Sequence, residues 1–355
     1  MSNYLELQVS KIYNDTTDTA IIEFIAPVNK LTKFRAGQFI TLFFYDNNET
    51  IKRAFSICSI PEELPIIRLA IKHNNSGVTY RSLINKVKTG DKIKALPPLG
   101  NFTLERVKGK KRHLFFLGAG SGISPLYSMI KSELVHNTEN RLTLIYANRN
   151  EDSVIFSDEL RSLESEYTDR FNIFNIFSQS TDKTQKYRGR ISPTLLHEIL
   201  NSYSEKLRDS DFFICGPSGF NDIITSFLTS LGVPAEQIHI EKFIVKLITD
   251  NENIKSKERL VTLIVDGEKH EFIVPENKTI LSSAAKQGIN VPCDCQEGRC
   301  GTCRARLLSG ILLLKNQTAL DNNELFKESC LTCVGYPASE NVVIFYEDEP
   351  EDGVN

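Results

Sequence analysis

The residues best able to do chemistry are cysteines near the C-terminal end of the chain. The chain has 355 residues and eight cysteines, and four of them crowd into the stretch PCDCQEGRCGTC. Two more follow, so the set is Cys293, Cys295, Cys300, Cys303, Cys330 and Cys333. Thiols at this density form disulfides, bind zinc or hold an iron–sulfur cluster. The spacing and the rest of the chain decide among these chemistries.

The spacing of the cysteines favours an iron–sulfur cluster. The pattern C-x4-C-x2-C, followed after 29 residues by a fourth cysteine, is the plant-type [2Fe–2S] ligand spacing, and here it consists of Cys295, Cys300, Cys303 and Cys333. Gly298 and Gly301 fit this interpretation. A loop around a cluster must bring backbone N–H groups toward sulfur without side chains in the way.

Zinc is the alternative for the same thiols. Two C-x2-C pairs have the spacing of zinc knuckles, and they are Cys300 with Cys303 and Cys330 with Cys333. This interpretation leaves Cys295 without a role, and it does not account for the turns described below, which have features of nucleotide-binding sites.

Composition places the chain among multidomain globular proteins. With 355 residues, 41% of them hydrophobic, it is too long for one core, so two or three domains are expected. The N-terminus has no signal-peptide pattern and no run approaches about eighteen apolar residues, so we expect a cytoplasmic protein without membrane insertion. Thiols stay reduced there, which favours metal ligation over disulfides. A formal net charge of −3 without a basic block predicts no nucleic-acid partner.

Changes of pattern divide the chain into domains. Residues 1–106 contain short alternating runs such as GQFITLFFYD, which are typical of an antiparallel β-barrel. Residues 107–244 alternate short buried strands with helical periods, such as HLFFLG before SPLYSMIKSELV, which predicts an α/β domain with a parallel sheet. Residues 245–258 are polar and poorly periodic, so we expect a linker. Residues 259–347 form the cysteine-bearing domain, and residues 348–355 an acidic, solvated tail.

The cysteine-bearing domain has two local signals ahead of its thiols. The stretch ERLVTLIVDGEKHEFIV consists of two alternating runs around Asp266-Gly267, which predicts a β-hairpin. A short helix is expected from Thr279 to Gln287, with Gly288 as its C-terminal stop. The cysteine loop should therefore follow a hairpin and a helix.

A glycine-rich turn follows the first strand of the α/β region. The stretch FLGAGSGISP ends a strand and begins a helix, and its candidate residues are Gly118, Gly120, Gly122 and Pro125. Such glycines let backbone N–H groups approach a pyrophosphate, the helix N-terminus favours its negative charge, and proline fits the first helical turn. The spacing departs from G-x-G-x-x-G because Ile123 occupies the third glycine position, so an ordinary tight turn is the alternative.

A second turn follows a later strand of the same region. Cys215, Gly216 and Pro217 come directly after the buried run DFFI. Open parallel sheets bind ligands at the carboxyl ends of their strands, so we expect both turns to face one crevice. For Cys215 taken alone, a small buried thiol is the alternative.

In the barrel region, the stretch KRAFSICS combines three kinds of side chain on one strand. Arg53 offers a phosphate clamp, Phe55 a stacking face and Ser56 a hydrogen-bonding hydroxyl. An ordinary half-exposed strand is the alternative for this stretch taken alone.

Taken in order, these segments resemble the ferredoxin–NADP reductase superfamily, fused at its C-terminus to a plant-type ferredoxin domain. The resemblance implies a flavin-binding barrel, an NAD(P)-binding α/β domain and a β-grasp [2Fe–2S] domain. The segment at 53–56 is similar to the family's R-x-Y-S motif, which implies Arg53 on the flavin phosphate, Phe55 against the flavin ring and Ser56 near flavin N5. Phenylalanine replaces the usual tyrosine, which keeps the stacking surface and loses a hydroxyl. LPPLGNF is similar to the segment that closes the family's barrel.

The resemblance implies further binding roles in the first two domains. SGVTYRSL lies where the family has its second flavin pyrophosphate motif, which implies Gly77 with Thr79 or Ser82 as the hydroxyl. GAGSGISP is similar to the NAD(P) pyrophosphate loop. The turn at Cys215 is similar to the one beside the nicotinamide, so Ser56 and Cys215 would align nicotinamide C4 with flavin N5.

Two more residues take roles from the same resemblance. Arg149 in YANRNEDSVIF is placed to reach a 2′-phosphate, which suits NADPH, although relatives with this segment use either nucleotide. Phe243 in IHIEKF resembles the final aromatic residue that shields the flavin ring in fused members.

The domain order resembles that of reductase components that feed iron oxygenases, among them the phenylacetyl-CoA epoxidase and ketosteroid hydroxylase groups. The implied cofactors are FAD, or FMN as in some relatives, and a [2Fe–2S] cluster, with NADPH or NADH as electron donor. The implied partner is an oxygenase or another iron protein that accepts electrons. A redox sensor or zinc-stabilised adaptor without turnover is the alternative. The presence of Arg53, Ser56 and both nucleotide turns in one chain argues against it.

Overall fold

The computed structural model describes residues 4–46, 49–73, 81–104, 111–136, 139–241, 243–248, 256–321 and 328–346. The chain divides into two compact units, one from Tyr4 to Glu241 and one formed mainly by the C-terminal part that begins at residue 242. None of the helices in these described ranges is long and apolar enough to cross a membrane.

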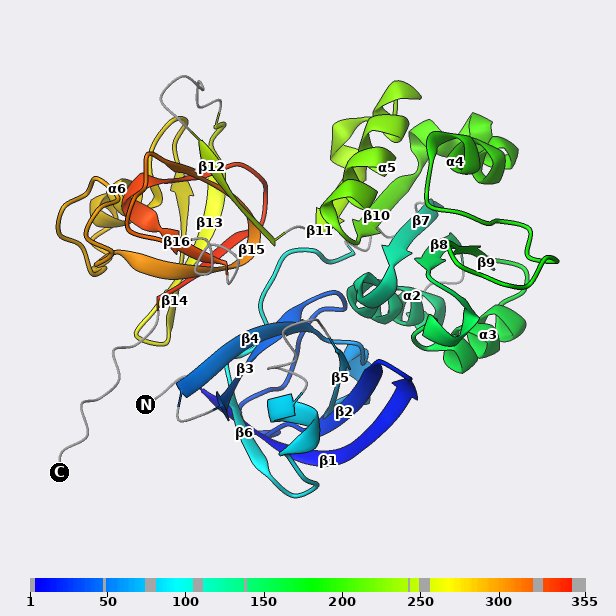
Figure 1. Ribbon diagram of the computed structural model, residues 1–355, viewed down its shortest axis with the longest axis horizontal. Helices are drawn as coiled ribbons and strands as arrows, with labels where there is room; N and C mark the ends of the chain where they lie inside the picture. The colour runs from blue at the N-terminus through cyan, green and yellow to red at the C-terminus, as the bar shows by residue number, and fades with distance from the viewer. Residues whose placement is uncertain are drawn as a thin grey trace. The chain divides into compact units, whose positions relative to one another are not determined.

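The first unit begins with an antiparallel barrel (Figure 1) whose strands lie in the order β4-β3-β6-β1-β2-β5. The strands are β1 (Leu5–Thr16), β2 (Thr19–Ile25), β3 (Phe39–Asp46), β4 (Glu49–Ser56), β5 (Ile66–Lys72) and β6 (Lys92–Ala95). Buried and exposed residues alternate at the start of β1, which turns one face of the strand toward the barrel core. A bridge between Ile57 and Leu69 joins the two edges of the sheet. The predicted barrel is confirmed.

A parallel sheet follows in the order β11-β10-β7-β8-β9. Its strands are β7 (His113–Ala119), β8 (Arg141–Asn148), β9 (Phe171–Phe177), β10 (Asp211–Cys215) and β11 (Ile238–Glu241). One face is covered by α2 (Ile123–His136) and α3 (Ser157–Glu166), and the other by α4 (Pro193–Leu200) and α5 (Ser218–Ser230), as Figure 1 shows. The strand order reverses between β7 and β10, so their carboxyl ends meet at a topological switch point. The predicted α/β architecture is confirmed.

The barrel and the parallel sheet share a hydrophobic core within the first unit. Ile21 and Phe102 of the barrel belong to the same buried cluster as Tyr127 and Met129 of α2. The hydroxyl of Ser128 also donates a 2.7 Å hydrogen bond to a barrel carbonyl oxygen. This packing holds the barrel against α2, the helix that follows β7.

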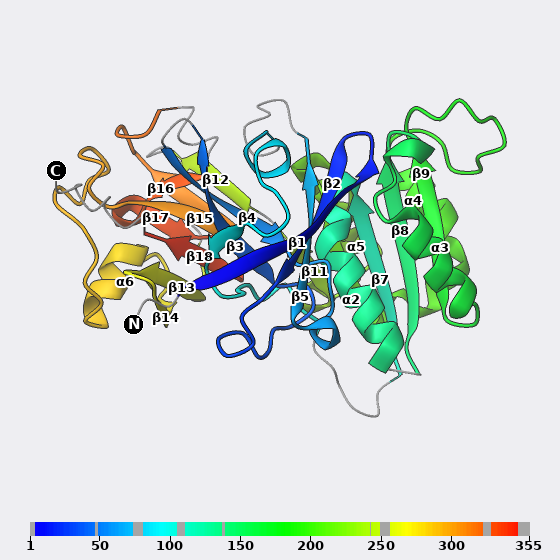
Figure 2. The same cartoon turned by 90° about the horizontal axis from the view of Figure 1, so that it is seen from below.

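The C-terminal unit is a mixed sheet with one helix, shown in two orientations in Figures 1 and 2. Its elements are β12 (Phe243–Ile248), β13 (Arg259–Val265), β14 (Glu268–Val274), α6 (Ile280–Lys286), β15 (Arg304–Lys315), β16 (Ser329–Leu331), β17 (Gly335–Pro337) and β18 (Val342–Phe345). The predicted hairpin is confirmed, because Val265 pairs with Glu268 and both loop residues, Asp266 and Gly267, have positive φ. The predicted helix is confirmed as α6, which Thr279 caps.

One segment differs from the sequence analysis. Residues 243–244, expected in the α/β domain 107–244, and residues 245–248, expected in the linker 245–258, lie together in β12 and pair in parallel with residues 310–315 of β15. The run FIVKLI has the β-branched and apolar residues of a strand. Its pairing partner lies more than sixty residues later, so local polarity could not indicate it. Shorter helical turns lie at Pro61–Glu63, Arg81–Asn85, Gly120–Gly122, Glu151–Ser153, Asn201–Asp209, Ala235–Gln237 and Thr332–Val334.

Candidate active site and metal-binding loop

The glycine turn lies at the carboxyl end of β7, as predicted. Gly118 belongs to β7, Gly120 and Gly122 bound one 3-10 turn, and α2 begins directly afterwards with Pro125 in its first turn. Gly120 has a φ of +53°, a backbone conformation that residues with a side chain rarely adopt. The first N–H groups of α2 have no partner within the helix, so the turn offers an anion-binding site suited to a pyrophosphate.

The second turn lies against the first. Parallel pairing of β7 with β10 sets Cys215 opposite Gly118. A Cβ atom at Gly122 would lie 2.1 Å from the carbonyl oxygen of Cys215, so only glycine lets the two turns approach this closely. Gly216 and Pro217 continue the second turn into α5. The structure thus brings together both turns at the switch point, where open α/β sheets bind nucleotides.

Two residues beside this turn were not identified from the sequence. Glu241 ends β11, pairs with Cys215 and is only 5% exposed, and burial raises its pKa to about 8. Asn221 donates from Nδ2 to the carbonyl oxygens of Gly216, at 3.0 Å, and Glu241, at 3.5 Å. Asn221 therefore links the turn to β11. The pairing of β10 with β11 brings Glu241 to the turn, so no local signal could have found it, whereas Asn221 lies only five residues after Gly216, in α5.

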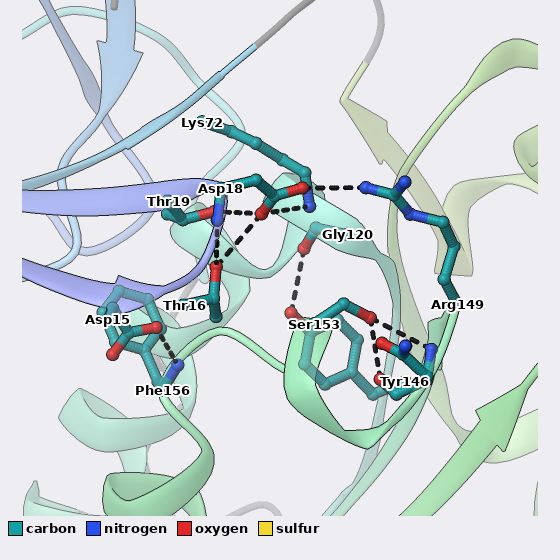
Figure 3. A network of polar contacts seen from close by, with 11 residues as sticks. Asp15, Thr16, Asp18, Thr19, Lys72, Gly120, Tyr146, Arg149, Ser153 and Phe156 are labelled. Atoms are coloured by element: carbon teal, nitrogen blue, oxygen red, sulfur yellow. Dashed lines mark hydrogen bonds and ion pairs between the residues drawn. The ribbon is translucent and has the colours of Figure 1, made fainter. Parts of the chain in front are cut away.

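Arg149 directly follows β8 and lies in a polar network that joins the sheet to the barrel (Figure 3). Its Nη2 atom is 2.7 Å from Oδ2 of Asp18, in the turn between β1 and β2. Lys72, the last residue of β5, reaches the same carboxylate, with Nζ 3.3 Å from Oδ1. The Tyr146 hydroxyl donates to the carbonyl oxygen of Gly120 at 2.9 Å, which ties the glycine turn to β8. Asp18 and Lys72 are further residues that the sequence did not reveal, since barrel and sheet must pack to bring them here.

The candidate flavin residues lie at the end of β4. Arg53, Phe55 and Ser56 are all half-buried. Phe55 pairs with Ile40 of β3 and packs in part against the barrel core, whereas Ser56 pairs with Phe39 and so points to the opposite face. A guanidinium and a hydroxyl that can donate hydrogen bonds, together with a partly exposed ring that can stack, are groups that fit a flavin nucleotide. Their individual roles stay predictions.

Four other predicted residues are described only in part or not at all. Gly77 and Thr79 lie outside the described residues. Ser82 belongs to the helical turn at 81–85, and Phe243 begins β12 in the C-terminal unit, but the description covers their backbones alone. The roles given to these four residues stay predictions.

The cysteine loop lies between α6 and β15. The sulfur of Cys295 accepts hydrogen bonds from the backbone N–H groups of Glu297 and Cys300, each at 3.4 Å. Gly298 and Gly301 have φ of +75° and +78°, a conformation that suits glycine. The loop therefore directs N–H groups toward sulfur, as the sequence analysis expected.

The other two candidate ligands are buried beside the sheet. Cys303 directly precedes β15, Cys333 lies in the turn after β16, and a hydrogen bond from the Cys333 thiol lowers the pKa of Cys303. The thiols meet as two pairs, Cys295 with Cys300 and Cys303 with Cys333. Across the described ranges, no three His, Cys, Asp or Glu side chains gather as a metal site. Thiols with N–H donors aimed at sulfur are nevertheless the donor set of a [2Fe–2S] cluster.

Cys330 has a different environment, which disfavours the zinc alternative. It pairs with Ala305, is fully buried in the apolar core, and burial raises its pKa. A zinc knuckle built on Cys330 and Cys333 would therefore require this core to open.

Comparisons with known proteins agree with this geometry. Three family models match, the oxidoreductase FAD-binding domain at residues 6–104, the oxidoreductase NAD-binding domain at 116–226 and the 2Fe-2S iron-sulfur cluster binding domain at 263–338. One subunit of 1,2-phenylacetyl-CoA epoxidase from Escherichia coli K12 is 29% identical over 98% of this chain and 99% of the relative. The ferredoxin reductase component of 3-ketosteroid-9-alpha-monooxygenase from Rhodococcus rhodochrous is 30% identical over 95% of each. Phthalate dioxygenase reductase shares the fold, with a TM-score of 0.56 and 23% identity over 97% of this chain and 98% of that one.

Proposed function

The chain belongs to the ferredoxin–NADP reductase superfamily, in the group with a C-terminal 2Fe-2S domain, and we propose that it is the reductase component of a multicomponent oxygenase. It is an oxidoreductase that uses NAD(P)H, FAD and a [2Fe–2S] cluster to supply electrons to an oxygenase. The observation that carries the proposal is the presence, in one chain, of paired turns at the switch point of β7 and β10 and of a four-cysteine loop.

The bound groups supply the chemistry, because FAD accepts a hydride from NAD(P)H and a [2Fe–2S] cluster takes up electrons singly. The chain supplies position and charge. We assign Arg53 to the flavin phosphate, Phe55 to the face of the ring and Ser56 to a hydrogen bond near N5. The half-buried positions of these three side chains at the end of β4 support the assignment.

The two turns at the switch point would hold the dinucleotide. We assign the pyrophosphate to the backbone N–H groups from Gly118 to Gly122 and to the N-terminus of α2. We assign the nicotinamide to the turn at Cys215, which Asn221 holds to β11. The close approach of Gly122 to Cys215 keeps these two subsites next to each other.

The cluster would be held by Cys295, Cys300 and Cys303 of the cysteine loop and by Cys333 of the turn after β16. N–H donors to the sulfur of Cys295 would favour its thiolate form and stabilise the negative charge of the bound cluster. We also place the first two domains at 1–106 and 107–241, and we assign the strand at 243–248 to the last domain, with whose β15 it pairs.

For the partner we propose an oxygenase of the phenylacetyl-CoA epoxidase type. The support is similarity along almost the full length of the matching component of that epoxidase. Similarity to the 3-ketosteroid-9-alpha-monooxygenase reductase is equally extensive, so an oxygenase of that type is the second candidate.

The test of this function uses the full-length protein with added oxygenase components. Mixed with NADH or NADPH and the oxygenase of either type, it should support product formation at a rate that rises with its concentration. The oxygenase that reaches saturation at the lower reductase concentration identifies the partner class. Reduction of ferricyanide without support for either oxygenase would contradict the proposed partner. Failure to oxidise either nucleotide would contradict the proposed function itself.

A further inference from the structure

Asp18 is the central acceptor of the network between barrel and sheet (Figure 3). Its carboxylate accepts hydrogen bonds from the hydroxyls of Thr16, at 3.0 Å, and Thr19, at 3.1 Å. It also forms ion pairs with Lys72 at 3.3 Å and with Arg149 at 2.7 Å. Only 24% of the Asp18 side chain is exposed, so four donors hold this carboxylate in one place.

Within this network, the group formed by Asp18, Lys72 and Arg149 carries more positive than negative charge. Burial acts to raise the pKa of Asp18, but Lys72 and the hydroxyl donors outweigh it, so the pKa lies below its ordinary value and the group is ionised at neutral pH. One carboxylate and two cations give a formal charge of +1. The Arg149 side chain is 61% exposed, so one part of it faces solvent while another part is held by Asp18.

The network borders the site assigned to the dinucleotide. Arg149 follows β8, the neighbour of β7, and in such sheets the residues after the second strand face the adenosine ribose. The Nζ atom of Lys72 lies 4.0 Å from the position that a Cβ atom at Gly120 would take, so Lys72 reaches the glycine turn. An arginine in this place contacts the 2′-phosphate when the nucleotide is NADPH.

We propose that Asp18 sets the discrimination between NADH and NADPH by holding Arg149 in an ion pair that a 2′-phosphate has to displace. The phosphate brings about two negative charges beside the carboxylate, so it competes for Arg149 and is repelled by Asp18. NADH lacks this group and binds without that exchange. The inference rests on the proposed function, because it assigns the adenosine site to the end of β8.

The test measures binding of adenosine fragments to wild-type protein and to Asp18→Asn by titration calorimetry. The probes are 2′,5′-ADP, which carries the 2′-phosphate, and 5′-AMP, which does not. Asp18→Asn should bind 2′,5′-ADP about 3- to 10-fold more tightly, with 5′-AMP affinity changed less than about twofold. In steady-state assays, the ratio of kcat/KM for NADPH to that for NADH should rise by a similar factor, mainly through KM.

A matched control removes a carboxylate elsewhere on the barrel. Glu23 is 18% exposed and pairs with Arg68 at 3.1 Å, so Glu23→Gln deletes the same charge from a comparable ion pair. It should leave the preference for 2′,5′-ADP over 5′-AMP unchanged. An equal rise in that preference in both variants would show a general charge effect and overturn the proposal.

The partner cation gives a second, independent variant. Arg149→Gln should weaken 2′,5′-ADP binding and leave 5′-AMP binding almost unchanged. Asp18→Asn added to it should raise the preference for 2′,5′-ADP by a smaller factor than it does in the wild-type background, because only the direct repulsion by Asp18 is then removed. If Asp18→Asn does not fold, Arg149→Gln can still overturn the proposal, because equal loss for both probes would show that Arg149 does not bind the 2′-phosphate for which Asp18 is proposed to compete. An unchanged or lowered preference for 2′,5′-ADP in folded Asp18→Asn also overturns the proposal. Fragment binding does not require turnover, so failure of the proposed function would be seen separately, as a lack of NADH and NADPH oxidation by wild-type protein.

Discussion

The two binding regions of this chain are built in opposite ways. In the unit from Tyr4 to Glu241, the candidate dinucleotide site consists of backbone turns whose positions follow from the pairing of β7 with β10. In the C-terminal unit, the candidate ligands are four side chains, three of them on a loop between α6 and β15. A site made of turns depends on tertiary pairing, whereas a site made of side chains depends on residue type and spacing. Changes to the two regions should therefore have different consequences.

The largest effect should come from a thiol of the loop. Cys303→Ser removes one of four ligands, so we expect loss of the [2Fe–2S] absorption and a fall of more than about 100-fold in reduction of a one-electron protein acceptor. Flavin reduction by NAD(P)H should persist, since its residues lie in the other unit. Iron content, visible spectra and cytochrome c assays measure this, with the exposed Cys293→Ser as control. Loss of the cluster in both variants would contradict the ligand assignment.

The corresponding variant in the first region disrupts the close backbone contact between the two turns. Gly122→Ala places a Cβ atom 2.1 Å from the Cys215 carbonyl oxygen, so the turns must separate. We expect a loss of about 2–4 kcal/mol in the free energy of unfolding and at least about tenfold slower flavin reduction by NAD(P)H. Stopped-flow absorbance and urea unfolding measure the two effects.

Gly219→Ala is the matched control for this variant, because a Cβ atom there meets nothing within 4 Å. Gly219 lies in α5, where alanine favours the helix, so this variant should be neutral or slightly stabilised. Equal losses at the two positions would contradict the role given to the contact of the two turns.

The free energy of unfolding should depend on pH through Glu241, the buried carboxyl group at the end of β11 in the first region. Burial raises the pKa of Glu241 to about 8 from an ordinary value of 4.5. The folded state binds the proton of the Glu241 carboxyl group more tightly than the unfolded state does. This proton therefore stabilises the fold fully below pH 4.5, and the stabilisation is lost as the pH rises through about 8. Across that range the free energy of unfolding should fall by up to about 1.4 kcal/mol per pH unit from this group.

Glu241→Gln should remove that slope, and the exposed neighbour Glu236→Gln should retain it. The chain has no tryptophan, so circular dichroism in urea is the suitable signal for unfolding. A slope that survives in Glu241→Gln would show that other groups control this pH dependence.

The smallest effect should come from two glycines of the C-terminal unit. Gly288 and Gly298 have similar positive φ, +71° and +75°, but a Cβ atom at Gly288 meets nothing, whereas one at Gly298 lies 3.0 Å from Val334 and 3.1 Å from Gln317. Gly288→Ala should cost about 1 kcal/mol from backbone strain alone, and Gly298→Ala about 1 kcal/mol more. Thermal unfolding of the two variants compares them. Equal losses in the free energy of unfolding would mean that the loop shifts at Gly298 enough to accommodate the added Cβ atom.

The contrast between features set by nearby residues and features set by tertiary pairing also explains which parts of the fold could be predicted from the sequence. The hairpin at Asp266-Gly267 and the helix α6 were predicted because turn and cap residues act over a few positions, and Gly288 ends the helix with positive φ. The strand at 243–248 was assigned in part to a linker, because its partner in β15 lies far along the chain. Local chemistry is visible in a sequence, and distant pairing is not.

Prediction of the site followed the same division. The ligand spacing of the cysteines and the glycine turn could be identified from residues close together in sequence. The carboxylate that binds Arg149 could not, because Asp18 is 131 residues away and meets it only when the barrel packs on the sheet. Glu241 was missed for the same reason, since strand pairing brings it to the turn at Cys215. Asn221 lies close to that turn in sequence, but its hydrogen bond to the Glu241 carbonyl oxygen depends on the same pairing.

An anaerobic titration of the full-length protein with NADH or NADPH tests most directly whether one chain joins the two regions into an electron path. Visible absorption follows the flavin, and an electron paramagnetic resonance sample at the end point reports on the cluster. The account predicts flavin bleaching together with the signal of a reduced [2Fe–2S] cluster. Flavin bleaching without an iron signal, or a colourless protein that contains zinc, would contradict it.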